Sequence, residues 1–291
     1  MPVRIVQSKQ NARLKQLRRA LAAPGRDSDG LAGIEGPNLL GEAVRAGLRV
    51  DCVFVAQGAE ALLEGVELAE ETEVLVMPRE LLAGAMTTET PQAVAALVAQ
   101  PVWSWEQVIG IRGRPAPLLV VLAGVQDPGN LGTILRSAEA FGASGVVSLA
   151  GTVSAWNPKA VRGSAGSVFR LPMIAAGAED AIPRLHKERI RIWATLPHGA
   201  TPANEANLAG PVALVIGNEG NGVPAAVLAR ADDLLTIPCP GPVESLNAAV
   251  AASVLLYEAS RQRVGLRMAG SDLSQNAGRM GHPGPRSGGS R

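Results

Sequence analysis

Short apolar runs, separated by polar segments with glycine or proline, recur along most of the chain. Runs of this kind without alternation are typical of strands buried on both faces of a parallel sheet, and stretches with helical spacing lie between them. This alternation predicts an α/β domain in the second half, with helices on both faces of its sheet. The predicted strands are 118–123, 145–149, 168–170, 190–194, 212–216 and 234–237, and the predicted helices are 131–142, 158–163, 179–187, 224–229 and 246–262.

The first hundred residues alternate in the same way and predict a smaller α/β domain over residues 1–102. The predicted helices are 37–46 and 59–69, the predicted strands are 50–56 and 74–77, and a helical stretch from Pro78 precedes a turn-and-strand region at 90–99.

An earlier helix is expected where Leu14, Leu17 and Leu21 fall at helical spacing and form an inner stripe. Basic residues crowd the rest of this segment, namely Lys9, Arg13, Lys15, Arg18 and Arg19. Two interpretations remain open: a surface helix with a solvated basic face, or a helix that contacts nucleic acid.

Two segments lack a core pattern. Residues 103–117 read as a linker rich in proline, glycine and arginine, whose Trp103 and Trp105 either pack it onto a domain or stack on bases. Residues 265–291 are rich in glycine, serine and proline and are expected to form a disordered tail. The second domain is therefore expected to span residues 118–264.

Composition narrows the class of protein. A length of 291 residues, 47% of them hydrophobic, suggests about two domains with cores of their own. No run is long enough to span a membrane, and the polar start lacks the apolar core of a signal peptide, so we expect a cytoplasmic protein. Two cysteines and three histidines suggest neither a disulfide framework nor a metal site. A net charge of +1 does not by itself indicate a nucleic-acid partner.

Three polar segments that follow predicted strands carry the candidate chemistry. Asn130 and Arg136 follow strand 118–123, a glycine-rich loop at 217–222 follows strand 212–216, and Ser245 and Asn247 begin the last helix. Each segment alone has an ordinary explanation, since glycine-rich turns are common in α/β domains and Ser and Asn are common helix caps. A dinucleotide-binding domain is disfavoured because no Gly-x-Gly-x-x-Gly follows the first strand.

Taken together and in this order, the three segments resemble the three motifs of the SpoU (TrmH-like) branch of the SPOUT methyltransferases. The matching residues are Asn130, Gly132 and Arg136, then Gly217 to Gly222, then Ile237 to Asn247. The resemblance implies a SPOUT parallel sheet with helices on both faces and a C-terminal trefoil knot, preceded by an L30e-like RNA-binding domain. It also implies methylation of RNA ribose 2′-hydroxyls with S-adenosylmethionine as cofactor.

The resemblance assigns roles to individual residues. Arg136 is the expected catalytic residue, with Asn130 and Glu219 holding it and the neighbouring loops in place. Ser245 and Asn247 are expected to orient the hydroxyl or the cofactor carboxylate. Since a guanidinium stays protonated in proteins, a clamp on phosphate and alkoxide suits Arg136, while a role as base after phosphate assistance remains open. The cofactor pocket is expected to contain Thr195, Leu196, Gly217, Asn218, Ile237 and Leu246, and RNA is expected to contact Asn11, Lys15, Arg18 and Arg19.

Within this class the substrate and the assembly are open. We expect ribosomal RNA, with a tRNA substrate, an antibiotic-resistance rRNA methylase and a non-catalytic RNA-binding scaffold as alternatives. The last helix has small residues on one surface and apolar residues on more than one face, which predicts a homodimer unless both faces are buried within one subunit.

Gly217 is expected to let the backbone approach the cofactor closely.

Overall fold

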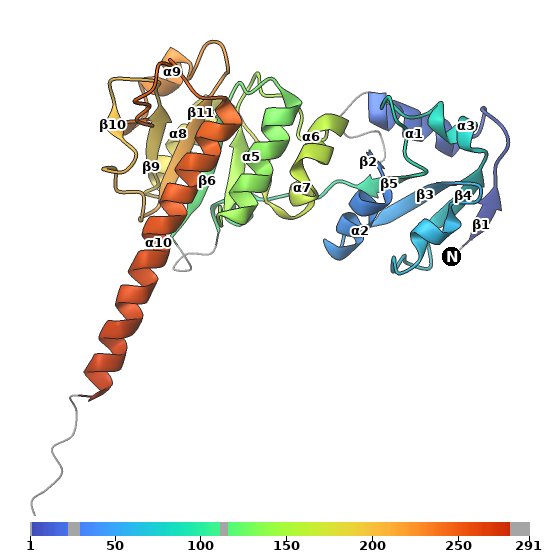
Figure 1. Ribbon diagram of the computed structural model, residues 1–291, viewed down its shortest axis with the longest axis horizontal. Coiled ribbons are helices and arrows are strands. Elements are labelled where there is room, and N and C mark those ends of the chain that lie inside the picture. The colour runs from blue at the N-terminus through green and yellow to red at the C-terminus, as the bar shows by residue number, and fades with distance from the viewer. Residues whose placement is uncertain (1, 23–29, 111–115, 280–291) are drawn as a thin grey trace, which may run out of the picture.

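The computed structural model describes the backbone of residues 2–22, 30–110 and 116–279 and the side chains up to residue 264. Two α/β domains lie side by side, with the first at one end of an elongated molecule (Figure 1). The strands form two sheets, one of five strands and one of seven, and the predicted domain boundaries stay a prediction.

The first domain contains a five-stranded mixed sheet in the order β1-β4-β3-β5-β2. Strand β5 is antiparallel to both of its neighbours, and the other pairings are parallel. The strands are β1 (Val3–Ile5), β2 (Leu31–Glu35), β3 (Val50–Ala56), β4 (Glu73–Met77) and β5 (Val94–Ala99).

Helices cover both faces of this sheet because its central strands are apolar on both sides. Helices α1 (Ala12–Ala22) and α3 (Arg79–Ala83) share a core cluster with Phe54 of β3, whereas α2 (Pro37–Arg45) shares one with Val53. The predicted helix at 59–69 was wrong. Only a short 3-10 helix, η1 (Glu60–Leu63), forms there, because none of its residues is buried and Gly65 turns the chain with φ +77°.

The second domain contains a seven-stranded sheet in the order β10-β12-β9-β11-β6-β7-β8, and every pairing in it is parallel. This confirms the predicted parallel sheet. The strands are β6 (Leu118–Ala123), β7 (Gly145–Ser148), β8 (Met173–Ala175), β9 (Arg191–Thr195), β10 (Thr201–Pro202), β11 (Val212–Gly217) and β12 (Asp233–Thr236).

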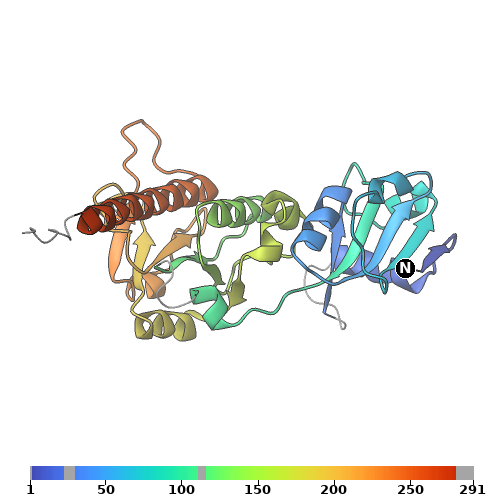
Figure 2. The same ribbon diagram turned by 90° about the horizontal axis from the view of Figure 1, so that it is seen from below.

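Helices lie on both faces of this sheet, with α5 and α10 side by side on one face and α8 on the other (Figure 2). The helices are α4 (Trp105–Ile109), α5 (Pro128–Ala140), α6 (Pro158–Ser164), α7 (Ser167–Arg170), α8 (Ala178–Lys187), α9 (Ala225–Leu228) and α10 (Ala248–Arg279). The predicted trefoil knot is not tested by the order of strands and stays a prediction.

The predicted strand at 168–170 was wrong, because these residues belong to α7. Gly166 starts this helical turn from the left-handed conformation with φ +89°, and Val168 and Phe169 are buried from the helix. The sheet resumes only after Pro172, in β8.

The linker region is partly ordered by its own residues. Ser104 begins α4 with a capping box, and Val108 and Ile109 are buried. Trp103 and Trp105 pack against the core of the second domain, which agrees with the packing alternative. Residues 111–115 lie outside the described residues.

Helix α10 continues to Arg279, into the segment predicted to be a disordered tail, and residues 280–291 of that segment lie outside the described residues. No helix within the described ranges is both long and apolar enough to cross a membrane.

Candidate active site

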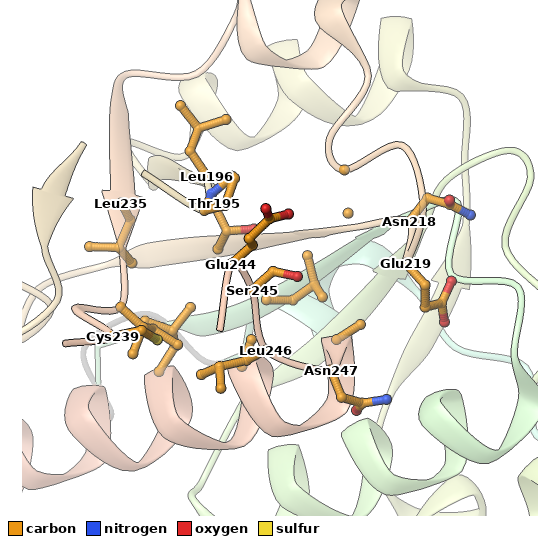
Figure 3. Close-up of a pocket in the computed structure, with 18 of the residues that line it drawn as sticks. Thr195, Leu196, Asn218, Glu219, Leu235, Cys239, Glu244, Ser245, Leu246 and Asn247 are labelled. Carbon is orange, nitrogen blue, oxygen red and sulfur yellow. The ribbon is translucent and has the colours of Figure 1, made fainter. Parts of the chain in front are cut away.

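A cavity of about 370 Å³ opens where β9, β11 and β12 end and α10 begins (Figure 3). Ligands of parallel α/β sheets bind at this edge, beyond the carboxyl ends of the strands. The six residues predicted for the cofactor pocket all line this cavity: Thr195, Leu196, Gly217, Asn218, Ile237 and Leu246.

The side-chain hydroxyl of Thr195 and the backbone amide of Leu196 form hydrogen bonds within the sheet. The hydroxyl of Thr195 donates to the carbonyl of Val215 at 2.8 Å, and the amide of Leu196 donates to the carbonyl of Leu235 at 2.8 Å. This wall therefore offers mainly apolar surface, which suits the apolar parts of a ligand.

The structure gives Gly217 a second reason beside its predicted close approach to the cofactor, which stays a prediction. A Cβ at this position would overlap the backbone of Gly222 and Val223, because the loop after β11 folds back on its own strand. Backbone hydrogen bonds of 2.9 Å in both directions between Asn218 and Gly222 close this loop. The glycine is thus required by the loop that forms the cavity wall.

Asn218 organises the same loop with its side chain. Its Oδ1 accepts hydrogen bonds from the amides of Gly220 and Asn221 at 2.9 and 3.0 Å, and its Nδ2 donates to the carbonyl of Gly124 at 2.8 Å. The loop is thereby tied to the end of β6, and Glu219 is held next to the first motif.

The three motifs meet in one chain of hydrogen bonds centred on Asn130. Asn130 Nδ2 donates to Glu219 Oε1 at 2.9 Å, and Asn247 Nδ2 donates to Asn130 Oδ1 at 3.0 Å. Burial opposes the charge of Glu219, but the hydrogen bonds from Asn130 and nearby amides outweigh it and lower the pKa of this carboxyl group. Glu219 is therefore a carboxylate at neutral pH.

Helix α5 places Asn130 there through its N-cap. Asp127 Oδ1 accepts from the amide of Asn130 at 2.8 Å, and Lys159 holds the other carboxylate oxygen at 3.0 Å. The hydrogen bonds from Lys159 and Asn130 lower the pKa of Asp127.

Arg136 lies elsewhere on α5. It is exposed, does not line the cavity, and forms no hydrogen bond or ion pair with any described residue. Asn130 and Glu219 bind each other, and Asn130 binds Asn247, so these residues connect the neighbouring loops, as predicted, but do not contact Arg136. Six positions along an α-helix turn a side chain about 120° away, so Arg136 cannot share the face of Asn130.

The start of α10 carries the third motif. Asn247 caps the helix, with Oδ1 accepting from the amide of Ala249 at 2.9 Å, and Ser245 lines the cavity. Sequence reasoning missed Cys239 and Glu244, which also line it. Glu244 stands directly before Ser245 in the motif, and this adjacency is the signal that could have identified it.

The four residues predicted to contact RNA lie at the start of α1 or on its surface. Asn11 Oδ1 accepts from the amide of Leu14 at 3.1 Å and caps the helix. Lys15, Arg18 and Arg19 are exposed and have no ion pair with any residue in the described ranges. The structure thus leaves three cations on one helix available to a partner.

Within the described ranges, no three His, Cys, Asp or Glu side chains are grouped so that they could hold a metal ion.

Fold and site together define a methyltransferase-like α/β domain with a ligand cavity at the carboxyl ends of parallel strands, attached to the first domain, which carries an exposed basic helix. Residues 117–257 match the SpoU rRNA Methylase family, and residues 11–96 match the MRM3-like substrate binding domain. The chain is 31% identical over 252 residues to the 23S rRNA (guanosine(2553)-2′-O)-methyltransferase RlmP of Bacillus subtilis (strain 168), covering 87% of this chain and 97% of that protein.

Solved structures give the same result. The SpoU methyltransferase AviRb from Streptomyces viridochromogenes in complex with AdoMet is 31% identical, with a TM-score of 0.77 over 88% of this chain and 99% of that one. An AdoMet-bound rRNA methyltransferase from Sinorhizobium meliloti is 30% identical, with a TM-score of 0.77 over 89% and 98%. The chain belongs to the SpoU rRNA methylase family, and its second domain has the SPOUT methyltransferase fold.

Proposed function

We propose that this protein transfers a methyl group from S-adenosylmethionine to a ribose 2′-hydroxyl of ribosomal RNA. The observation that carries the proposal is the chain Glu219–Asn130–Asn247, which joins the three motif segments at the mouth of the cavity. The rRNA 2′-O-methyltransferase named among the relatives supports the substrate class.

The cavity suits this cofactor. S-adenosylmethionine, when bound, supplies a methyl group on a sulfonium cation. The volume of about 370 Å³ lies within the range of small-molecule pockets, roughly 300–1,000 Å³. Ile237 and Leu246 offer apolar walls, and the carboxylates of Glu219 and Glu244 favour a cationic over a neutral ligand.

Arg136 acts on the RNA rather than on the cofactor in this proposal. Its exposed guanidinium has no partner among the described residues and is free to clamp the phosphate beside the target ribose. When bound RNA brings the target ribose to Arg136, its protonated fork stabilises the alkoxide that develops as the hydroxyl proton passes to water. Ser245 lies in the cavity, where it orients the hydroxyl, while Asn130 and Asn247 fix the surrounding loops.

The first domain supplies RNA affinity. Lys15, Arg18 and Arg19 present three cations on α1, and phosphate contacts of this kind give salt-dependent, sequence-independent binding. Asn11, which caps α1, contributes to this surface by holding the start of the helix.

The working unit is a homodimer formed through α10. One face of this helix is buried with Leu255 and Leu256, and another leaves an apolar stripe exposed. The stripe consists of Val250 (49% exposed), Val254 (39%), Tyr257 (54%) and Val264 (48%). Spacings of three, four and seven place these side chains on one face, which a second copy of the chain covers. Helix α5 lies beside it, through a 2.7 Å hydrogen bond between Ser137 and Ser253.

Transfer of labelled methyl groups from S-adenosylmethionine to purified RNA tests the proposal. We expect incorporation into ribosomal RNA, in keeping with a cytoplasmic protein, and little into tRNA. Incorporation into tRNA alone would overturn the substrate class. Antibiotic resistance conferred by expression would identify a resistance methylase. Absence of both cofactor binding and transfer would identify a scaffold.

A further inference from the structure

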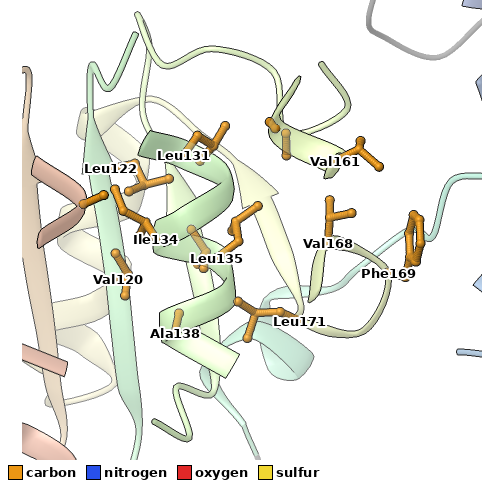
Figure 4. Packing of buried hydrophobic residues seen from close by; sticks show 14 of the residues in the cluster. Val120, Leu122, Leu131, Ile134, Leu135, Ala138, Val161, Val168, Phe169 and Leu171 are labelled. Atoms are coloured by element: carbon orange, nitrogen blue, oxygen red, sulfur yellow. The ribbon is translucent and has the colours of Figure 1, made fainter. Parts of the chain in front are cut away.

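The two domains meet in an apolar contact whose edge carries a charged network. Leu39 of α2 and Val161 and Phe169 of the second domain belong to one continuous cluster of buried side chains. Figure 4 shows Val161 and Phe169 at the outer side of that domain, away from β6. Helix α6 also contacts β2. Apolar contact of this kind holds surfaces together without fixing their angle, because it is non-directional.

Arg170, the last residue of α7, bridges the domains at the edge of this contact. Its Nε and Nη2 donate to the two carboxylate oxygens of Glu139 on α5, at 2.6 and 3.0 Å. Its Nη1 donates to Glu42 on α2 of the first domain at 2.5 Å. Arg45 binds the other oxygen of Glu42 at 2.5 Å. Three nitrogen atoms of the Arg170 guanidinium thus donate to carboxylates of two different helices, which fixes the orientation of its plane.

The arginines of the network stabilise the ionised form of both carboxyl groups. The hydrogen bonds from Arg170 lower the pKa of Glu139, and those from Arg45 and Arg170 lower the pKa of Glu42. Both carboxyl groups are thus ionised at neutral pH. A bidentate arginine is directional, so the bridge specifies a geometry that a lysine would not.

The backbone is adapted to this bridge. A Cβ at Gly166 would lie 2.7 Å from Cβ of Glu42, so only glycine lets α2 approach α7 this closely. Its φ of +89° also favours glycine. The positions of Glu42 and Arg170 therefore depend on each other across 128 residues of chain.

Through Glu139, Arg170 is bound to α5, the helix that carries Asn130 and Arg136. Glu139 lies three positions after Arg136 on α5, and Asn130 lies in the first turn of the same helix. On the other side, Glu42 belongs to the domain whose helix α1 carries the exposed cations. Arg170 thus joins the domain that binds RNA to the helix that carries the catalytic arginine.

We propose that Arg170 is a positioning residue, which fixes the angle of the RNA-binding domain relative to α5 and thereby selects the ribose that reaches Arg136. The kinetic consequences of this inference rest on the proposed RNA methylation. Its structural consequence, a fixed angle between the two domains, does not. Arg170 touches neither the cofactor cavity nor, in this proposal, the reacting atoms.

Kinetics test the consequence for RNA. We expect Arg170→Ala and Glu42→Gln each to raise KM for a folded rRNA fragment about tenfold, below the roughly hundredfold loss that a misplaced reacting group causes. The affinity for S-adenosylmethionine and kcat at saturating RNA should change little. The double variant should be no worse than the worse single one, because both single changes remove the same contact between the domains, Arg170 with Glu42. Methylation should also spread to neighbouring riboses.

A matched control is Arg184→Ala. Arg184 is 40% exposed against 35% for Arg170 and also binds a carboxylate, Glu106 at 3.0 Å, but this pair does not reach the first domain. It should leave KM and the methylation site unchanged. Arg170→Lys keeps the charge without the fork and should fall between wild type and Arg170→Ala.

A second measurement needs no RNA. Spin labels on Glu64→Cys and Lys187→Cys, in a Cys239→Ser background and mixed with an excess of unlabelled protein, report the distance between domains within one chain. We expect a narrow distribution for the otherwise unchanged protein and a broad one for Arg170→Ala. Glu42→Gln replaces Arg170→Ala if the latter does not fold.

An unchanged distance distribution, or an unchanged KM and methylation site, would overturn the inference. If the wild-type chain methylated no RNA, the proposed function would fail, whereas the distances would still decide whether Arg170 sets the angle.

Discussion

Asn130 and Glu219 are 89 positions apart in the sequence, yet a 2.9 Å hydrogen bond joins their side chains. Because Asn130 also accepts from Asn247, one amide connects all three motif segments. Its donor and acceptor are both used, so no other common side chain of this size satisfies both partners.

Asn130→Ala removes both of these hydrogen bonds. We expect kcat/KM to fall by about a hundredfold through misplaced loops. The pKa of Glu219 should rise towards its ordinary value. In the wild type its lowered pKa contributes stability above the unfolded-state value of about 4.3, and this is lost as pH falls through the folded-state pKa. The stability deficit of the variant should therefore narrow in acid, as urea unfolding at several pH values would reveal. Thr133→Ala, which alters only a bond within α5, should show no such effect.

Arg136→Ala should leave folding and cofactor affinity nearly intact, because Arg136 lies outside the cavity and binds no described residue. Turnover should fall by about a hundredfold or more, the range for one lost transition-state contact. Arg136→Lys should restore little, since the planar fork is lost. Near-wild-type turnover in either variant, measured at saturating cofactor, would refute the assignment.

Gly217→Val should abolish S-adenosylmethionine binding by forcing the loop off β11. We expect it also to lower the free energy of unfolding by about 1–3 kcal/mol, the usual cost of overpacking. Gly220→Ala is the control, since a Cβ there meets only Asn218 Oδ1 at an ordinary 3.5 Å. Titration calorimetry and urea unfolding measure both effects. Wild-type affinity in Gly217→Val would place the cofactor elsewhere.

Replacement of Lys15, Arg18 and Arg19 together by Ala should weaken RNA binding. The slope of log K against log salt should flatten by about three units at most, one per lost phosphate contact. Arg79, Lys187 and Arg230 are exposed as well, and their joint replacement is the control. Equal slopes for the α1 variant and the wild type would show that α1 does not touch phosphate.

Val254→Glu places a charge in the exposed stripe of α10 and should convert a dimer into a monomer. Light scattering at micromolar concentration measures the mass. Leu62→Glu, at an exposed apolar side chain of the first domain, should remain dimeric. A wild-type mass of one chain, with full activity, would contradict the dimer.

The sequence was informative where structure is local. Strand, glycine-rich loop and helix start are adjacent in the chain, so the cavity-lining loops could be located before the structure was known. Local signals failed where tertiary contacts decide. Val168 and Phe169 suggest a strand, but Gly166 starts a helical turn, so they form part of α7. The position of Arg136 relative to Asn130 depends on helical phase, and the pairing of Arg170 with Glu42 joins residues 128 positions apart, which no local pattern reveals.

The most direct test of the central claim is a nucleotide-resolution map of 2′-O-methylation in ribosomal RNA. It compares cells that produce the wild-type chain, cells that lack it, and cells that produce Arg136→Ala. The account predicts a ribose methylated only with the wild-type chain and largely lost with Arg136→Ala. Identical maps in all three, or a methyl group that appears on a base instead of a ribose, would contradict it.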